Sequence, residues 1–395
     1  MNKKILKFGL FDAIFWGFCA SYCGFITSYL LEEGMNRTVL SIDIAVYMII
    51  AFGAAVFWGG WCDRMHSNKK VFIPEFILTF LLALVVFLIA KINIQVTSFI
   101  YPLFAFAVFP LGSNMDAWML RYLDHDTAAY SKARAMGSVG YAVPMLFCGQ
   151  LIHLFGYPAM IITASVYACI TLVIAVLMAE QKEIGVIHTD KKQSFRKLFS
   201  NKKYAMMLVI VFLTGLAVAP MNNLKIVFLQ EVGGNVSSLG IDSFIGVGCQ
   251  ALFICLSGNM HRVPAKIRLL VMSICMMAAM FFTMMAHSPI LVFLGTAVSN
   301  SSFGIMLPTV REITQKEVDA SQVNTAYSLS DAMYSSAAAV AAMSYSGFMI
   351  DALGTKSVCL LGLGITILVT LLITIQWLGK EQKHASQISL AYEQK

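Results

Sequence analysis

The segment EQKEIGVIHTDKKQSFRKLFSNKK, residues 180–203, divides the chain, because it is the one long hydrophilic stretch in it. On either side, short polar connections alternate with apolar runs of roughly 20 residues, the length needed to cross a bilayer. Six runs precede the segment and six follow it: 8–31, 41–62, 71–90, 97–122, 131–154, 158–179, 204–230, 238–258, 267–287, 289–310, 322–350 and 356–378. This pattern predicts an all-α membrane protein with twelve transmembrane helices.

The composition is that of a chain lying almost wholly in a bilayer. Of the 395 residues, 58% are hydrophobic and 12% are charged, against roughly 45–50% and 25% in soluble domains. No room is left for a separate soluble catalytic domain, so we do not expect an enzyme. The net charge of +7 does not indicate a nucleic-acid partner, because the basic residues lie between apolar runs rather than on one folded face. The nine cysteines include no CxxC pair, so we interpret them as buried hydrophobes and expect no metal site.

The positions of Lys and Arg predict the orientation, because positively charged loops stay on the cytoplasmic side. With the N-terminus inside, 24 of the 28 basic residues fall in cytoplasmic segments and three, Arg37, Lys91 and Lys356, fall in outer loops. The remaining one is Lys225, inside the run 204–230. A missed or invented span would reverse part of this separation. We therefore predict a multi-pass protein of the inner (plasma) membrane with both termini in the cytoplasm.

A shift of 198 residues brings marked positions of the two halves into register. The pairs are Gly60 with Gly258, Arg64 with Arg262, Pro110 with Pro308, Gly149 with Gly347 and Gly156 with Gly354. These coincidences predict two homologous, pseudo-symmetric six-helix bundles, as in two-lobed transporters that work by alternating access. We place the bundles at 1–179 and 204–380, with a cytoplasmic linker at 180–203 and a cytoplasmic tail at 381–395. A channel is not favoured, since the sequence shows no selectivity filter or charge ring.

The connection after the second run carries a family signature. Residues 59–70 read GGWCDRMHSNKK, which resembles the G-x-x-x-D-R-x-G-R-K loop of the major facilitator superfamily. His66 and Ser67 stand where glycine and arginine are usual. The resemblance implies the two-lobed fold of that superfamily. It also implies gating by Asp63 and Arg64, because an Asp–Arg pair can latch neighbouring helices and release them as the lobes rock.

A closer resemblance covers the first five runs. FGLF at 8–11, the Asp63–Arg64 loop and the stretch 116–141 resemble the lactose permease and nucleoside/proton symporter branch. The resemblance implies a substrate clamp made by an acid, an arginine and a G-x-x-G-aromatic motif, which here are Asp116, Arg134, Gly137, Gly140 and Tyr141. The second half does not match the proton relay of that branch. The run 289–310 has no ionisable residue, and 238–258 has only Asp242, near its outer end.

Charges inside spans are further functional candidates, because each costs several kcal/mol unless it is paired or hydrated. Lys225, with Asn222 beside it, is predicted to hold an anionic substrate or to exchange its proton with a carboxylate; the alternative is a lysine that snorkels to the headgroups. Asp331 is predicted to titrate or to gate; the alternative is an acid favoured by a helix N-terminus. A pair between Lys225 and Asp331 is not expected, since their depths differ by some 18 Å at 1.5 Å per residue.

Asp116 and Arg134 have the strongest case among these charges, and Asp12 ranks below the others. Asp116 and Arg134 are predicted to bind substrate together, with a salt bridge that only ties two helices as the alternative. Asp116 could also titrate, so Asp116, Asp331 and Lys225 are the predicted proton-coupling residues. Asp12 is expected to lie shallow, at the cytoplasmic interface.

Together these features predict a secondary active transporter. No G-x-x-x-x-G-K-[ST] motif is present, so its energy should come from a gradient, and we expect no cofactor. The predicted activity is proton-coupled symport of a small polar organic solute, such as a sugar, a nucleoside or an aromatic acid. A drug/proton antiporter of the same fold and an uncoupled facilitator or membrane sensor are the alternatives. The expected partners are this solute and the lipid bilayer, and we expect a monomer.

Overall fold

The computed structural model describes residues 3–124, 126–179, 201–257, 262–319 and 322–393, except the side chains of Asp63, Thr127, Asn324 and 376–393. Within these residues, twelve helices are long and apolar enough to cross a membrane, which confirms the predicted fold class. Most of the linker, Gly258 of the repeat and the side chains of the tail lie outside the described residues. The predicted domain bounds stay a prediction.

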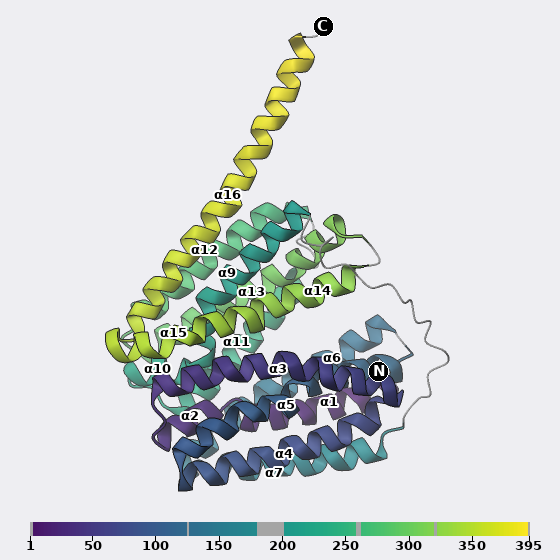
Figure 1. Ribbon diagram of the computed structural model, residues 1–395, viewed down its shortest axis with the longest axis vertical. Helices are drawn as coiled ribbons and strands as arrows, with labels where there is room; N and C mark the ends of the chain where they lie inside the picture. The colour runs from purple at the N-terminus through teal and green to yellow at the C-terminus, as the bar shows by residue number, and fades with distance from the viewer. Residues whose placement is uncertain (1–2, 125, 180–200, 258–261, 320–321, 394–395) are drawn as a thin grey trace.

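The first lobe (purple to blue-teal in Figure 1) contains seven helices that form six spans. They are α1 (Lys3–Tyr22), α2 (Ile26–Glu32), α3 (Arg37–Met65), α4 (Asn68–Ile92), α5 (Ile94–Tyr122), α6 (Thr127–Phe155) and α7 (Pro158–Leu177). Its centre is aromatic: Phe8, Phe11, Phe72 and Trp118 pack edge to face among α1, α4 and α5. The helices extend a few residues beyond the predicted runs, because their polar end turns remain helical outside the apolar stretch.

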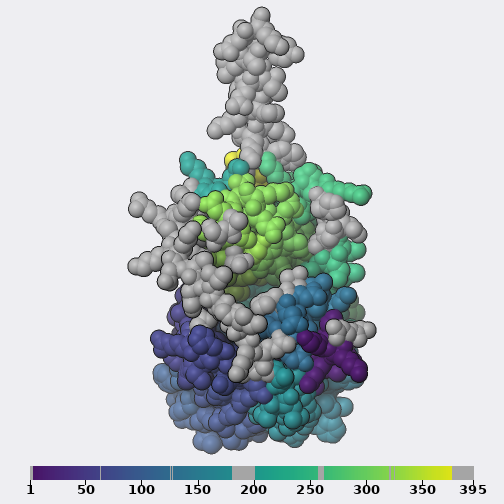
Figure 2. All heavy atoms as spheres, turned by 90° about the vertical axis from the view of Figure 1, so that its right-hand side faces the viewer, coloured from purple at the N-terminus to yellow at the C-terminus, as the bar shows by residue number. Residues whose placement is uncertain are grey.

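The second lobe (teal to yellow in Figure 1) repeats this arrangement. It contains α9 (Lys202–Asn223), α10 (Lys225–Glu231), α11 (Val236–Ser257), α12 (Ala265–Met284), α13 (Pro289–Glu317), α14 (Val323–Ala332), the π-helix η3 (Met333–Ala337), α15 (Ala338–Leu353) and α16 (Thr355–Glu393). Figure 2, seen from the end of the molecule where α1 begins, shows the two lobes as separate blocks, blue and purple below green.

The first span of each lobe is broken, which the apolar runs did not predict. α1 ends at Tyr22 and α2 begins at Ile26, whereas α9 ends at Asn223 and α10 begins at Lys225. The 198-residue shift places the end of α1 three residues before the end of α9, and the start of α2 one residue before the start of α10, so the two breaks nearly coincide. Local chemistry explains both: Gly24 favours a bend in the first lobe, and Pro220 has no amide hydrogen to support the turn before the break in the second.

The repeat extends to backbone conformation and to packing. Gly156 and Gly354 end α6 and α15 with φ values of +76° and +80°, in the left-handed region that only glycine adopts easily. Gly149 and Gly347 both lie where one lobe touches the other: Gly149 against Gly240 of α11, and Gly347 against Ser41 of α3. A pseudo-two-fold axis therefore relates the two contacts between lobes, α6 with α11 and α3 with α15.

The lobes are hydrogen-bonded at the end of the molecule where α2 ends and α3 begins, which we call the far end. The opposite end, where α1 begins, is the terminal end. Ser41 donates its hydroxyl hydrogen to the carbonyl of Met343 and accepts the amide hydrogen of Gly347 at 3.0 Å. The hydroxyl of Thr38 donates to Asp351 at 2.7 Å. These bonds hold the interface closed at the far end.

The structure shows what His66, Ser67 and Lys69 do in the signature loop between α3 and α4. His66 has φ +47°, the left-handed conformation for which the family's usual glycine is suited. Ser67 caps α4 by accepting the amide hydrogen of Lys70 at 3.0 Å. Lys69 donates to the last carbonyls of α7, those of Val176 at 2.6 Å and Met178 at 2.7 Å. The loop therefore joins α4 to the end of α7.

Candidate functional site

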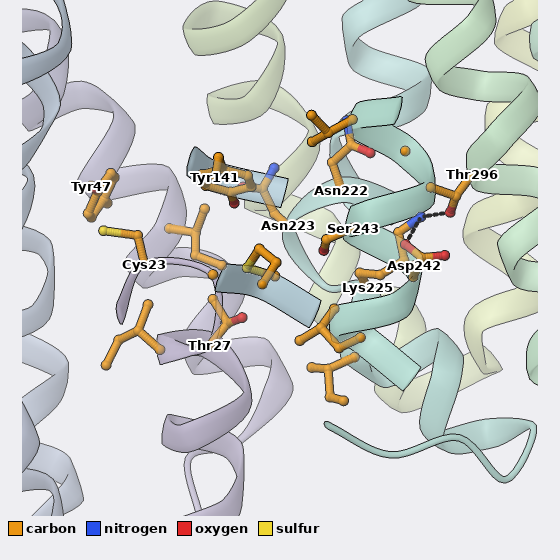
Figure 3. Close-up of a pocket in the computed structure, with 18 of the residues that line it drawn as sticks. Cys23, Thr27, Tyr47, Tyr141, Asn222, Asn223, Lys225, Asp242, Ser243 and Thr296 are labelled. Atoms are coloured by element: carbon orange, nitrogen blue, oxygen red, sulfur yellow. Dashed lines mark hydrogen bonds and ion pairs between the residues drawn. The ribbon is translucent and has the colours of Figure 1, made fainter. Parts of the chain in front are cut away.

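A cavity of about 350 Å³ lies between the two lobes, and residues of both line it (Figure 3). The two broken spans supply its centre. Cys23, Gly24 and Thr27 come from the break in the first lobe, and Asn222, Asn223 and Lys225 come from the equivalent break in the second. Interrupted helices at a repeat interface are a typical position for a transporter's binding site, because the break turns polar groups toward the cavity.

The two walls of the cavity differ in chemistry. The wall from the first lobe is aromatic and apolar, with Tyr47, Tyr101, Phe104, Tyr141, Met48 and Met145. The wall from the second lobe is polar, with Asn222, Asn223, Lys225, Asp242, Ser243, Thr296 and Asn300. Figure 3 shows the labelled residues of the two walls facing each other. Such a site can stack a ring on one side and hydrogen-bond it on the other.

The polar wall is built around a buried ion pair. Lys225 Nζ lies 3.6 Å from Asp242 Oδ2 and donates a hydrogen bond to Thr296 Oγ1 at 2.6 Å. Lys225 is 8% exposed and Asp242 is 2% exposed. The second carboxylate oxygen of Asp242 is buried without a hydrogen-bond partner in the described part of the chain.

Asp242 is the charged residue of this site that the sequence did not single out. It was noted only as an acid near the outer end of its apolar run. In the structure α10 places Lys225 beside it, because the break at Leu224 redirects the chain there. Lys225 contacts Asp242 rather than Asp331, which agrees with the expected difference in depth between Lys225 and Asp331.

Arg134 forms a second charged cluster, which does not line the cavity. Its Nε lies 3.1 Å from Asp116 Oδ1, and its Nη1 lies 3.5 Å from Asp12 Oδ2. The guanidinium also stacks over the ring of Trp16, 4.6 Å from the ring centroid. The structure thus brings Asp116 and Arg134 together, as the sequence predicted, whereas Tyr141 lies two helical turns further along α6 and faces the cavity.

Asp12, which the sequence led us to expect near the cytoplasmic interface, is fully buried inside the protein. α1 is helical from Lys3 onward and packs along α6, which covers this side chain. Two glycines make that packing possible. A Cβ at residue 137 would lie 2.0 Å from Asp12 Oδ2, and one at residue 140 would lie 2.3 Å from the carbonyl oxygen of Ala13. The G-x-x-G motif is therefore the surface that receives α1 and its buried acid.

The predicted gating residues have different surroundings. Asp331 pairs with Arg311 of α13, with 2.6 Å between Oδ2 and Nη2, and Arg311 stacks over the ring of Tyr327 at 4.3 Å. About half of the Asp331 side chain is exposed. Arg64 is exposed at the terminal end, and the side chain of Asp63 lies outside the described residues.

Two six-helix lobes of repeated topology around a cavity at their interface are typical of membrane transporters. The chain belongs to the MFS_1 like family of the major facilitator superfamily, whose model matches residues 5–361. It is similar to a maltose permease of Geobacillus stearothermophilus, with 22% identity over 323 residues and 81% of each chain covered.

Solved structures show the same fold. A nucleoside transporter, NupG, superposes with a TM-score of 0.81 at 15% identity, covering 94% of this chain and 99% of NupG. A D-xylose-proton symporter superposes with a TM-score of 0.69 at 13% identity, covering 93% and 96% of the two chains.

Proposed function

We propose that this protein is a proton-coupled symporter of a small, neutral solute that carries a ring and several hydroxyl groups, such as a sugar or a nucleoside. The observation that carries the proposal is the two-sided cavity, with aromatic side chains on one wall and the Lys225–Asp242 pair among amides on the other. Because Lys225 already has a carboxylate partner, the cavity has no uncompensated positive charge to attract an organic anion.

The size of the cavity supports a small solute. About 350 Å³ is near the lower end of the roughly 300–1,000 Å³ range of small-molecule pockets. The names of the relatives, a maltose permease, a nucleoside transporter and a D-xylose-proton symporter, agree with that class. A cavity of this size and polarity favours symport of a polar solute over export of bulky hydrophobic drugs.

Each predicted site residue takes a role in this proposal. Tyr141 packs against the solute's ring, and Asn222, Lys225 and Asp242 bind its hydroxyl groups. Asp116 and Arg134 lie outside the cavity lining, so we propose that they serve coupling. Asp331, with Arg311, and Asp63, with Arg64, act as gates at the terminal end of the interface.

The distribution of Lys and Arg supports an orientation with the terminal end in the cytoplasm of a cell whose inner (plasma) membrane holds the protein. The closed far end then faces outward. The described conformation is an inward-facing state of an alternating-access cycle, with the proton gradient as the source of energy and a monomer as the working unit.

Thermal unfolding of the purified protein with maltose, D-xylose, uridine and the hydrophobic cation tetraphenylphosphonium tests the proposed substrate class. A solute at 100 times its Kd stabilises the protein by about 2.7 kcal/mol. We expect at least one neutral solute to raise the Tm, and Lys225→Ala and Asn222→Ala to abolish the shift. Lys91→Ala, an exposed lysine at the far end of α4, is the matched control and should keep it.

Uptake by proteoliposomes under an imposed pH gradient then tests the coupling. Accumulation of the stabilising solute should need an external pH below the internal pH. A Tm that rises only with tetraphenylphosphonium, or accumulation unaffected by collapse of the pH gradient, would overturn the proposed function.

A further inference from the structure

The cluster around Arg134 holds more negative than positive charge when both of its acids are ionised. Asp12 and Asp116 share one guanidinium. Asp116 and Arg134 are each about one-third exposed, so water reaches them, whereas Asp12 is fully buried behind Arg134. An ionised carboxylate at that position is costly unless it is fully paired. One added proton makes the cluster neutral.

The geometry indicates which acid takes that proton. Arg134 lies closer to Asp116, at 3.1 Å, than to Asp12, at 3.5 Å. Both carboxylate oxygens of Asp12 are buried without a hydrogen-bond partner in the described part of the chain. Compared with Asp116, Asp12 therefore has the longer contact with the guanidinium and loses more of its solvation.

The groups that face Asp12 include one cation, one further acid and several neutral polar groups. On α6 these are the cation Arg134 and the phenol of Tyr130, which also interacts with the further acid, Asp116 of α5. On α1 the thiol of Cys19 lies nearby, and α7 places Tyr167 against Gly17 one turn further along α1. In this part of the structure Arg134 is therefore the cation that faces Asp12.

A chain of ring contacts joins this cluster to the cavity. Tyr141 lines the cavity and meets Trp16 edge to face, with 6.2 Å between ring centroids and 71° between planes. Trp16 in turn lies under the guanidinium of Arg134. A solute that displaces Tyr141 therefore presses on the ring that positions Arg134 between its two acids.

We infer that Asp12 is the acid that takes up the coupling proton, and that Trp16 is the positioning residue that links its charge to occupation of the cavity. The inference rests on the proposed symport and names its coupling site. A hydronium ion on the open side gives its proton to the Asp12 carboxylate, which forms one O–H bond and leaves water. Arg134 then pairs with Asp116 alone. Loss of the proton restores the contact with Asp12.

Infrared difference spectroscopy of the purified protein during a pH titration tests the assignment without a solute. Among the carboxylic acid carbonyl bands that grow as the pH falls, wild type should show one component that Asp12→Asn lacks. Asp43→Asn and Glu75→Gln are matched controls, because both residues are acids in the same lobe that are less than one-tenth exposed and have no cation among their hydrogen-bond partners in the described residues. They should keep that component. Identical titrating bands in wild type and Asp12→Asn would overturn the inference.

Transport measurements separate this inference from the proposed function. With maltose, D-xylose and uridine as probes, Asp12→Asn should lose accumulation under a pH gradient by about tenfold or more while keeping solute exchange at equilibrium. Exchange also shows that the variant is folded, and Asp12→Ser repeats the test if Asp12→Asn does not purify. Accumulation by Asp12→Asn at the wild-type level contradicts the inference alone. Wild type that accumulates none of the probes contradicts the proposed function, and the infrared result still decides the role of Asp12.

Variants of Trp16 test the link. Trp16→Leu should keep the infrared band of Asp12 but lose the pH dependence of solute binding, because the ring between Tyr141 and Arg134 is gone. Trp16→Phe keeps an aromatic face for the guanidinium and should restore part of that dependence. If solute binding by Trp16→Leu depends on pH as in wild type, Trp16 has no role in coupling.

Discussion

At the scale of single residues, sequence position predicts which charges lie in spans but not which of them face each other. Lys225, Asn222 and Tyr141 were singled out from the sequence, and the structure places all three at one cavity. Asp242 was noted only for its place near the outer end of its run and Asp12 was ranked as shallow, yet both are buried partners of basic residues. Depth follows from counting residues along a helix. Which side chains face each other depends on the rotation of each helix about its own axis and on the break at Leu224. Neither can be read from the apolar runs.

The Lys225–Asp242 pair gives the first prediction. Lys225→Met leaves a buried carboxylate without its cation and should lower the free energy of unfolding by about 3 kcal/mol, since breaking a buried ion pair exposes the full cost of the remaining charge. Replacing both residues, as Lys225→Met with Asp242→Leu, should recover most of that loss while solute binding stays absent. The measurement is thermal unfolding in detergent with solute titration. A double variant as unstable as the sum of the two single variants would mean that the residues do not interact.

At the scale of helices, small residues decide where elements approach each other. Gly140 lets α1 lie against α6, and Gly149 lets α6 lie against α11. From the sequence the G-x-x-G motif indicated a substrate clamp only through family resemblance. Its local role, to receive the backbone of α1, depends on a partner helix more than a hundred residues away in sequence, which no local pattern identifies.

Gly140→Ala is therefore expected to destabilise the protein. The added methyl would lie 2.4 Å from the Cα and 2.3 Å from the carbonyl oxygen of Ala13, backbone atoms that cannot turn aside. A loss of about 2 kcal/mol is expected for such overpacking. Gly53→Ala is the control, because a Cβ there meets no described atom within 4 Å, and it should be neutral or stabilise α3 by about 0.5–1 kcal/mol. Equal Tm values for the two variants would disprove the close approach.

The loop at His66 gives an element-scale prediction of opposite sign. His66→Gly should raise the unfolding free energy by up to about 1 kcal/mol, because glycine adopts the positive φ of this position without steric cost. His66→Ala keeps the strained backbone and should give no such gain. Differential scanning calorimetry of the two variants compares them directly, and a His66→Gly protein that unfolds below wild type would show that the His66 side chain itself stabilises the loop.

At the scale of the whole molecule, the sequence predicted the number of spans and their division into equal halves. Both predictions rest on patterns that extend along the whole chain, namely the lengths of the apolar runs and the 198-residue repeat. A misplaced helix boundary of a few residues changes neither pattern. It could not predict which end of the interface is closed. That depends on a few bonds between lobes, such as Thr38 with Asp351 and Ser41 with Gly347, whose partners are some 300 residues apart in the chain.

Locking the far end should stop transport. In a Thr38→Cys/Asp351→Cys variant, a short reagent that links the two thiols should abolish uptake of the probe solutes, because the lobes could no longer separate there, and reduction should restore it. The Thr38→Cys single variant, treated in the same way, controls for reaction with the nine native cysteines. Undiminished uptake by a fully linked protein would show that opening of this end is not part of the cycle.

The two walls of the cavity come from structurally equivalent halves of the chain but differ in chemistry. The first half supplies a stacking platform, and the second supplies hydrogen-bonding groups. Selectivity can therefore change through substitutions in one half without rebuilding the other. For an engineer, a chimera that keeps residues 1–179 and takes its second half from a relative is the direct route to a new solute preference, because it exchanges the pattern of donors and acceptors and leaves the ring-binding surface intact.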